Sequence, residues 1–278
     1  MRENVCESGV ESGEFGFQKK SPVFVRFLPG MVTISAFCVG LTSIRFALFQ
    51  KPEMAVLCIF VSALLDALDG KVARLFGQSS QFGAQLDSLS DLVCFGVAPA
   101  IILFLQSVYL LENAGWGICM FFTVCCALRL ARFNSELLSD DTKPAWEKKF
   151  FKGVPAPAGA ILALFPMILF FFTNNSIFLA SKFMAFCLLG SGILMISSVR
   201  TFSSKMAEVS NNKSSQIAII AATALFVICL VTDVWLTLAS AVTIYLISIP
   251  YGACVYSRKK RAEEEEAMLL EAPLELKE

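Results

Sequence analysis

The sequence predicts an all-α polytopic membrane protein. Of its 278 residues, 56% are hydrophobic and 17% are charged, whereas soluble domains contain about 45–50% apolar and about 25% charged residues. The mean hydropathy of the chain is +0.68. Its apolar residues also gather in runs long enough to cross about 30 Å of hydrocarbon as helices. These observations indicate a chain that folds mostly inside a lipid bilayer.

We expect about eight transmembrane helices, because eight apolar runs have the length of roughly 17–25 residues that a spanning helix needs. The expected helices cover residues 30–49, 53–75, 83–106, 115–134, 155–173, 179–198, 216–232 and 234–256. The first six belong to a predicted core at residues 23–205, and the other two form an additional pair at 206–256. Residues 1–22 are expected to be a disordered tail, and residues 257–278 a charged tail.

The distribution of charge predicts how the chain is oriented in the membrane. The 23 basic and 23 acidic residues balance, so net charge gives no reason to expect a nucleic-acid partner. If the N-terminus is cytoplasmic, 20 of the 23 Lys and Arg residues fall on the cytoplasmic side, as the positive-inside rule expects. An even number of spans then puts both termini in the cytoplasm. We expect a multi-pass protein of a bacterial inner membrane.

Four aspartates interrupt the second and third apolar runs. Asp66 and Asp69 are three residues apart, and Asp87 and Asp91 are four apart, so each pair lies on one helix face. A polar turn at residues 77–81 would join the two helices as a hairpin and bring the pairs together in the cytoplasmic half of the membrane. Four bare charges there would cost on the order of 10 kcal/mol. They must therefore face a polar cavity and be compensated.

Divalent cations are the compensation that the residue types favour. A structural ion pair with Arg74 is the alternative, but one cation cannot balance four anions. The chain contains no histidine, so a metal site here would consist of carboxylate oxygens, which suit Mg²⁺ or Mn²⁺. Two such ions about 3.5–4 Å apart activate an attacking oxygen and stabilise a phosphoryl transition state. The predicted active site lies between the second and third helices.

Glycines occur in register with the carboxylates, at positions where a ligand could press against the backbone. The whole stretch reads D-x2-D-G-x2-A-R-x8-G-x3-D-x3-D, and its eight positions are Asp66, Asp69, Gly70, Ala73, Arg74, Gly83, Asp87 and Asp91. This pattern resembles the signature of the CDP-alcohol phosphatidyltransferases. In that family the motif spans two adjacent membrane helices and binds a CDP-linked lipid with two divalent ions, and the enzymes displace CMP with an alcohol.

The resemblance implies a role for each position of the motif. Asp66, Asp69, Asp87 and Asp91 would ligate the two ions, and Asp91 would also act as the catalytic base. The residues implied in binding CDP-diacylglycerol are Asp66, Asp69, Gly70, Ala73, Arg74 and Gly83, with Arg74 on the diphosphate and the small residues against the cytidine. Enzymes of this family are commonly described as dimers, so a homodimer is suggested, although the sequence leaves the oligomeric state open.

Sequence stretches that flank the aspartate motif indicate which alcohol accepts the phosphatidyl group. "DLVCFGVAPA", "ALRLARFN" and "FFKGVPAPAGA" look like the branch of the family that makes phosphatidylserine, and "MISSVRTFSSK" is a looser match. The implied reaction transfers the phosphatidyl group from CDP-diacylglycerol to L-serine and releases CMP. Serine carries a carboxylate, so its pocket should contain a cation or amide. The candidates are Arg129, Arg132, Asn134 and Lys152; the alternative for the basic residues is a role as topology anchors.

Other functions stay open at this point. Choline, glycerol phosphate or inositol could replace serine as the acceptor. An intramembrane prenyltransferase also uses aspartate pairs, although on well-separated helices, and an ion-coupled transporter would also carry membrane carboxylates. One departure from the family pattern concerns the first span, where Gly30 stands in "FLPGMVT" at a position that is often Asn. Thr33 or Ser35 would then have to supply the missing polar contact.

Overall fold

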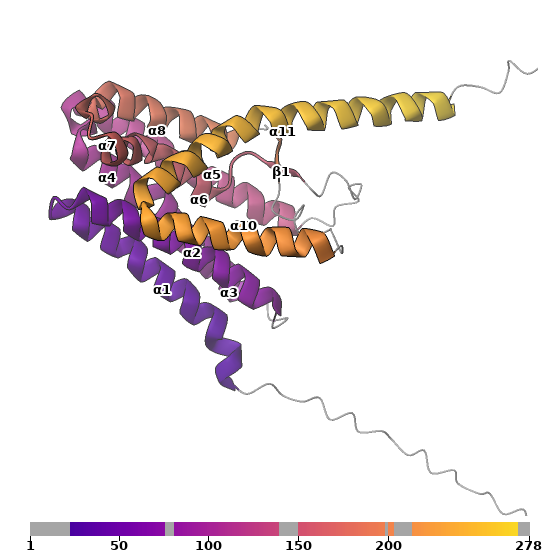
Figure 1. Cartoon of the computed structure of the whole chain (residues 1–278), viewed down its shortest axis with the longest axis horizontal. Coiled ribbons are helices and arrows are strands. Elements are labelled where there is room, and N and C mark those ends of the chain that lie inside the picture. The colour runs from indigo at the N-terminus through magenta and orange to yellow at the C-terminus, as the bar shows by residue number, and fades with distance from the viewer. Residues whose placement is uncertain (1–22, 76–80, 139–149, 198–199, 203–212, 272–278) are drawn as a thin grey trace, which may run out of the picture.

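The computed structural model describes residues 23–75, 81–138, 150–197, 200–202 and 213–271, and it is almost entirely helical (Figure 1). The longer helices are α1 (Val23–Leu48), α2 (Pro52–Leu75), α3 (Gln81–Asp91), α4 (Ala98–Gln106), α5 (Glu112–Leu138), α6 (Ala156–Ala163), α7 (Phe165–Thr173), α8 (Ser181–Ile196), α10 (Lys213–Thr232) and α11 (Val234–Glu271). A π-helical segment, η1 (Leu92–Val97), joins α3 to α4, and two 3₁₀ turns are η2 (Val108–Leu111) and η4 (Ser176–Leu179). Strands β1 (Phe150–Lys152) and β2 (Arg200–Phe202) form a short antiparallel ladder.

Helices occupy all eight of the predicted spans, but fewer of them qualify as membrane-crossing by length and composition. Within the described residues four helical stretches qualify, and a fifth does if α6 and α7, which meet at 47°, count as one bent span. α2 carries four charged residues in its second half, and α8 has only 16 residues. Several apolar helices thus indicate a membrane protein, while the number eight stays a prediction. The expected N-terminal tail and most of the polar turn lie outside the described residues, whereas residues 257–271 of the expected C-terminal tail continue α11 as helix.

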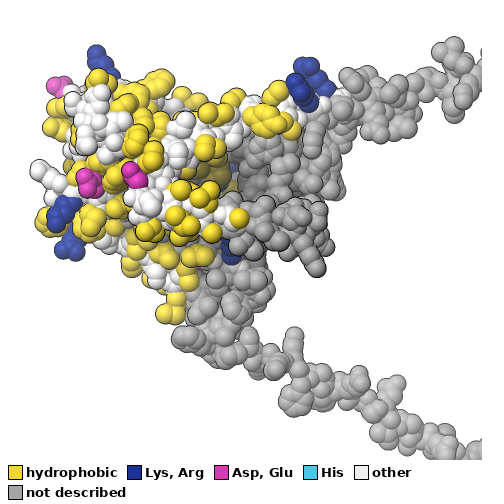
Figure 2. All heavy atoms as spheres, in the orientation of Figure 1, with side chains coloured by type: hydrophobic (Ala, Val, Ile, Leu, Met, Phe, Trp, Pro, Cys, Tyr) yellow, Lys and Arg dark blue, Asp and Glu magenta, His cyan; other side chains and the backbone are white. Residues whose placement is uncertain are grey.

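The helices pack around a single apolar core. α1 and α2 form an extensively packed antiparallel pair, α5 packs on α8, and α6 lies against α8. Fully buried side chains include Phe95, Phe122, Leu164, Met167 and Leu188. Many large apolar side chains on the outside are exposed instead, and hydrophobic side chains cover much of the visible surface of the bundle (Figure 2). This outer surface suits contact with lipid, because lipid tails are as apolar as the side chains themselves.

The chain between α3 and α4 widens into the π turn directly after Asp91. Pro99, in the first turn of α4, has no N–H to offer the carbonyl four residues earlier, and its ring crowds that carbonyl. Side chains of α5 satisfy the carbonyls nearby: Thr123 Oγ1 donates to Gly96 O at 3.3 Å and Cys119 Sγ to Ala100 O at 3.5 Å. Neighbouring helices commonly satisfy such irregular backbone inside membranes. The third predicted span is therefore one helical stretch, Phe82–Gln106, that contains a π turn.

Of the two C-terminal helices, α11 contributes buried side chains to the core, and α10 packs against α11. α11 contacts α7 and β2, and the ring of Trp235 near its start lies 4.5 Å from the ring of Phe171. Its 38 residues correspond to about 57 Å at 1.5 Å per residue. That length exceeds the hydrocarbon thickness, and Figure 1 shows α11 continuing well beyond the bundle.

Candidate active site

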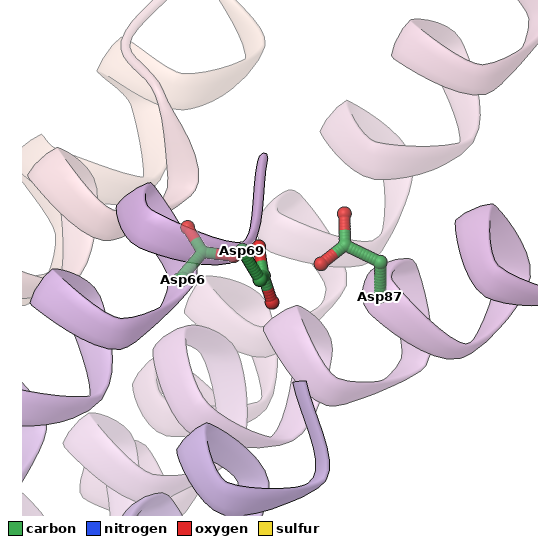
Figure 3. A group of neighbouring side chains, drawn as sticks. All are labelled: Asp66, Asp69 and Asp87. Carbon is green, nitrogen blue, oxygen red and sulfur yellow. The ribbon is translucent and has the colours of Figure 1, made fainter. Parts of the chain in front are cut away.

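Three aspartates from two helices converge at one end of the bundle. Asp66 and Asp69 come from α2 and Asp87 from α3, and one oxygen of Asp87 points toward the Asp66 and Asp69 side chains (Figure 3). One oxygen from each residue lies within 4.8 Å of those from the other two. The spacing of three places Asp66 and Asp69 on one face of α2, and α3, which packs against α1, adds Asp87. The structure thus brings together three of the four predicted metal ligands.

Asp69 is the most enclosed member of this group. Its side chain is 5% exposed, and the carboxylate makes hydrogen bonds with the side chain of Thr33 on α1 and with the backbone of Gly70. The second oxygen, Oδ2, is buried without a hydrogen-bond partner among the described residues. Buried polar atoms are nearly always paired. An unpaired carboxylate oxygen that faces two other carboxylates is therefore suited to a cation.

Asp91 lies beside this group and contacts it through Asp66. The Asp66 and Asp91 side chains form a hydrogen bond, although Asp91 is not one of the three residues that converge on a common point. Two carboxyl groups in such contact must share a proton or a cation, because like charges about 4 Å apart repel by roughly 4 kcal/mol at an effective dielectric constant of 20. The predicted fourth ligand is thus adjacent to the cluster, and its role in metal binding stays a prediction.

A divalent cation fits this donor set. Carboxylate oxygens are hard ligands that suit Mg²⁺ and Mn²⁺, and the three residues supply one oxygen each within a span that a single ion can bridge. Three mutually repelling carboxylates also need positive charge in order to stay ionised. The identity and the number of the ions are not determined by this geometry.

Arg129 supplies positive charge at the edge of the aspartates. It lies half-buried on α5 and interacts electrostatically with both Asp91 and Asp66. The structure thus links Arg129, one of the predicted serine-binding residues, to these carboxylates. Arg132, one turn later, is exposed. The side chain of Lys152 lies outside the described residues.

Asn134 connects α5 to α3 next to the cluster. Its amide Nδ2 donates to Ser88 Oγ at 2.9 Å, and Ser88 directly follows Asp87. The Asn134 side chain is therefore engaged in holding α3 against α5. The sequence predicts Asn134 in the acceptor pocket, and the contact to Ser88 does not test that prediction.

The small residues of the motif leave room beside the carboxylates. A Cβ added at Gly70 would have no other atom within 4 Å, so this stretch of α2 borders open space. Gly83 is half-buried near the start of α3. The predictions for the side chains of Ala73 and Arg74 lie outside the described residues.

Gly30 also borders open space, since a Cβ there would meet nothing within 4 Å. Of the two residues expected to compensate for the missing Asn, Thr33 bonds to Asp69. Ser35 instead donates to Met31 O in its own helix at 2.8 Å. Of the two, Thr33 contacts the cluster, and its role in place of the Asn stays a prediction.

Sequence reasoning did not identify Tyr245 on α11. Its hydroxyl is buried with no hydrogen-bond partner among the described residues, and it interacts electrostatically with Arg129. A tyrosine in the middle of the last apolar run was the only signal available. Nothing in its spacing relates it to the motif, which ends more than 150 residues earlier.

Membership of a known family agrees with this geometry. The profile of the CDP-alcohol phosphatidyltransferases matches residues 26–194, which is more than half of the chain. The chain therefore belongs to the CDP-alcohol phosphatidyltransferase family, as its motif predicts. The match covers most of α1, all of α2 to α7 and nearly all of α8, and it ends before α10 and α11.

Several relatives of the chain carry the name of one particular enzyme within this family. The chain is 37% identical to the CDP-diacylglycerol--serine O-phosphatidyltransferase of Mycobacterium leprae over 235 residues, which cover 84% of this chain and 77% of the relative. It is 34% identical to the Bacillus subtilis protein of the same name over 176 residues, which cover 63% of this chain and 90% of the relative. The Saccharomyces cerevisiae protein of that name is 40% identical over 136 residues, covering 47% of this chain and 48% of the relative.

Proposed function

We propose that this protein transfers the phosphatidyl group of CDP-diacylglycerol to L-serine, with release of CMP. The observation that carries the proposal is the convergence of Asp66, Asp69 and Asp87 within a complete family motif. The names of the relatives support serine as the acceptor. Family membership argues against an intramembrane prenyltransferase and against an ion-coupled transporter.

Three groups of residues would bind the nucleotide-lipid substrate: cation ligands, a diphosphate contact and small residues beside the cytidine. Asp66, Asp69 and Asp87 would hold divalent cations, and we propose two; the ions supply charge neutralisation for the diphosphate. Arg74 would contact the same diphosphate, while Gly70, Ala73 and Gly83 would let the cytidine approach the backbone. The open space beside Gly70 supports that placement.

Asp91 would act as the base. The serine hydroxyl oxygen forms a bond to the phosphatidyl phosphorus as the bond from that phosphorus to the CMP oxygen breaks. Asp91 takes the hydroxyl proton at a carboxylate oxygen, as a positioned carboxylate can. Arg129 would face the serine carboxylate as its counter-charge, with Arg132, Asn134 and Lys152 as further candidates at that pocket.

The orientation of the chain belongs to the same proposal. Both termini and the aspartate cluster would be cytoplasmic, so that CMP leaves into the cytosol while the lipid substrate enters laterally from the inner leaflet. The basic residues near the inner ends of the predicted spans support this orientation. A bacterial inner membrane and a homodimer are the expected location and assembly.

The proposal is tested by the choice of acceptor. Purified protein is incubated with CDP-diacylglycerol, Mn²⁺ and, in separate reactions, serine, choline, glycerol phosphate or inositol, and CMP release is measured. We expect release with serine alone. Release only with another alcohol would refute the acceptor and keep the family reaction, whereas no release with any alcohol would refute the reaction.

A further inference from the structure

Tyr245 carries a buried polar atom that the proposed chemistry does not yet use. Its hydroxyl has no hydrogen-bond partner among the described residues, although buried hydroxyl groups are normally paired. The ring itself packs against the apolar core. An unpaired hydroxyl in such a place costs stability unless some state of the protein gives it a partner.

Arg129 is the group that can serve as this partner. Tyr245 and Arg129 interact electrostatically, and Arg129 interacts in the same way with Asp91 and Asp66. A guanidinium has five N–H donors and no acceptor, whereas a phenol oxygen can accept a hydrogen bond. The two side chains are therefore complementary, and Arg129 lies between Tyr245 and the aspartates in this chain of interactions.

The helix that carries Tyr245 is well fixed in the bundle. α11 packs against α7 and β2, and the contact between Trp235 and Phe171 secures its first turn. Leu238 and Val242, which precede Tyr245 on the same helix, are buried in the core. A hydroxyl on such a helix is held at a defined point, as a positioning group requires.

We propose that Tyr245 is a positioning residue for acceptor recognition, whose hydroxyl accepts a hydrogen bond from Arg129 and holds the guanidinium where it meets the acceptor carboxylate. This inference rests on the proposed function and deepens it. It gives α11, which lies beyond the residues that match the family, a part in selecting an anionic amino-acid acceptor. Tyr245 itself does not touch substrate.

The test compares Tyr245→Phe with the wild type in CMP release at varied serine concentrations. We expect the KM for serine to rise about fivefold to tenfold, with kcat and the KM for CDP-diacylglycerol nearly unchanged. Tyr109→Phe is the matched control, because it makes the same chemical change at a side chain that is 50% exposed on η2. The control should leave all constants unchanged.

The same substitution in an Arg129→Lys variant distinguishes a role of the Tyr245 hydroxyl in positioning Arg129 from a role in packing alone. In Arg129→Lys the ammonium lacks the planar fork of the guanidinium, so adding Tyr245→Phe should change the serine KM less than twofold. If the hydroxyl is only a packing defect, Tyr245→Phe leaves the serine KM unchanged and leaves the melting temperature equal or higher. That result, or equal KM increases in both backgrounds, would overturn the positioning role.

The two proposals fail in different ways. An active wild type with an unaffected Tyr245→Phe variant would overturn the role of Tyr245 and leave the proposed function standing. A wild type that releases no CMP with serine would overturn the proposed acceptor, and the inference about Tyr245 with it.

Discussion

The proposed roles of the four motif aspartates, three as metal ligands and one as the base, are based on where each carboxylate lies. Three of them converge within 4.8 Å, and Asp69 contributes an oxygen with no other partner among the described residues. Asp91 instead contacts Asp66 and lies one helical turn beyond Asp87. In the proposed mechanism, a carboxylate at the edge of the cluster would take a proton from an approaching alcohol while the other three would hold cations.

We predict that Asp91→Asn lowers kcat for CMP release by about 100- to 10,000-fold, the usual contribution of a general base. The amide has nearly the same shape as the carboxyl and cannot accept the proton. CMP release with CDP-diacylglycerol and serine is the measurement, and a melting curve verifies folding. Turnover at the wild-type rate would remove Asp91 from the role of base.

We predict that Gly70→Ala raises the KM for CDP-diacylglycerol roughly tenfold, equivalent to about 1.4 kcal/mol of lost binding. The added methyl group meets no atom of the described residues within 4 Å, so we expect it to displace a bound ligand instead. The melting temperature should be unchanged or higher, because alanine favours a helix over glycine by roughly 0.5–1 kcal/mol. An unchanged KM would mean that the nucleotide does not approach Gly70.

The candidate site was predictable from sequence only where its residues are near neighbours along the chain. The spacing of three places Asp66 and Asp69 on one helix face, and the expected hairpin between two consecutive helices is what grouped Asp87 with them. Contacts between distant helices leave no such periodicity. Neither the link from Arg129 to the aspartates nor the buried Tyr245 hydroxyl could be read from spacing.

At the scale of single elements, the β1–β2 ladder joins two stretches that both resemble the same branch of the family. Lys152 pairs with Arg200, and Gly153 follows at φ +78°. A Cβ at Gly153 would lie 2.6 Å from Met195 O and 2.9 Å from Ser197 O. Only glycine fits this turn, which connects the ladder to the start of α6.

We therefore predict that Gly153→Ala destabilises the protein by roughly 1–3 kcal/mol, through backbone strain and the close contact with two carbonyl oxygens. Thermal unfolding in detergent is the measurement. Gly190→Ala on α8 is the control, because its Cβ would meet nothing within 4 Å, and it should leave the melting temperature unchanged or raise it. Equal melting temperatures for the two variants would show that the turn tolerates a side chain.

The positions of the helices were well predicted from the sequence, whereas the π turn and the bend between helices were not. Apolar runs gave all eight helical segments, because length and hydropathy are properties of the local sequence. The π turn after Asp91 and the 47° bend between α6 and α7 depend on prolines whose effect is set by neighbouring helices. Pro99 and Pro166 both fall in the first turn of the following helix, where proline is also compatible with a straight start.

At the scale of the whole molecule, the predicted orientation requires both ends of the chain to be cytoplasmic. We expect a C-terminal green fluorescent protein fusion to fluoresce in a bacterial host and a C-terminal alkaline phosphatase fusion to be inactive. The physical reason is the excess of basic residues at the proposed inner ends of the helices. The opposite pair of readings would invert the orientation and put the aspartates on the outer side.

Metal binding by the aspartate cluster decides whether the site can work as proposed. Electron paramagnetic resonance of Mn²⁺ titrated into the purified protein reports bound ions without any turnover. We predict that Asp69→Asn and Asp87→Asn each weaken Mn²⁺ binding at least about tenfold. Asp233→Asn should bind like the wild type, because Asp233 is exposed and its side chain only caps α11 through Leu236 N, a role that asparagine also fills. Mn²⁺ affinity equal to that of the wild type in both cluster variants would contradict a cation site at these aspartates.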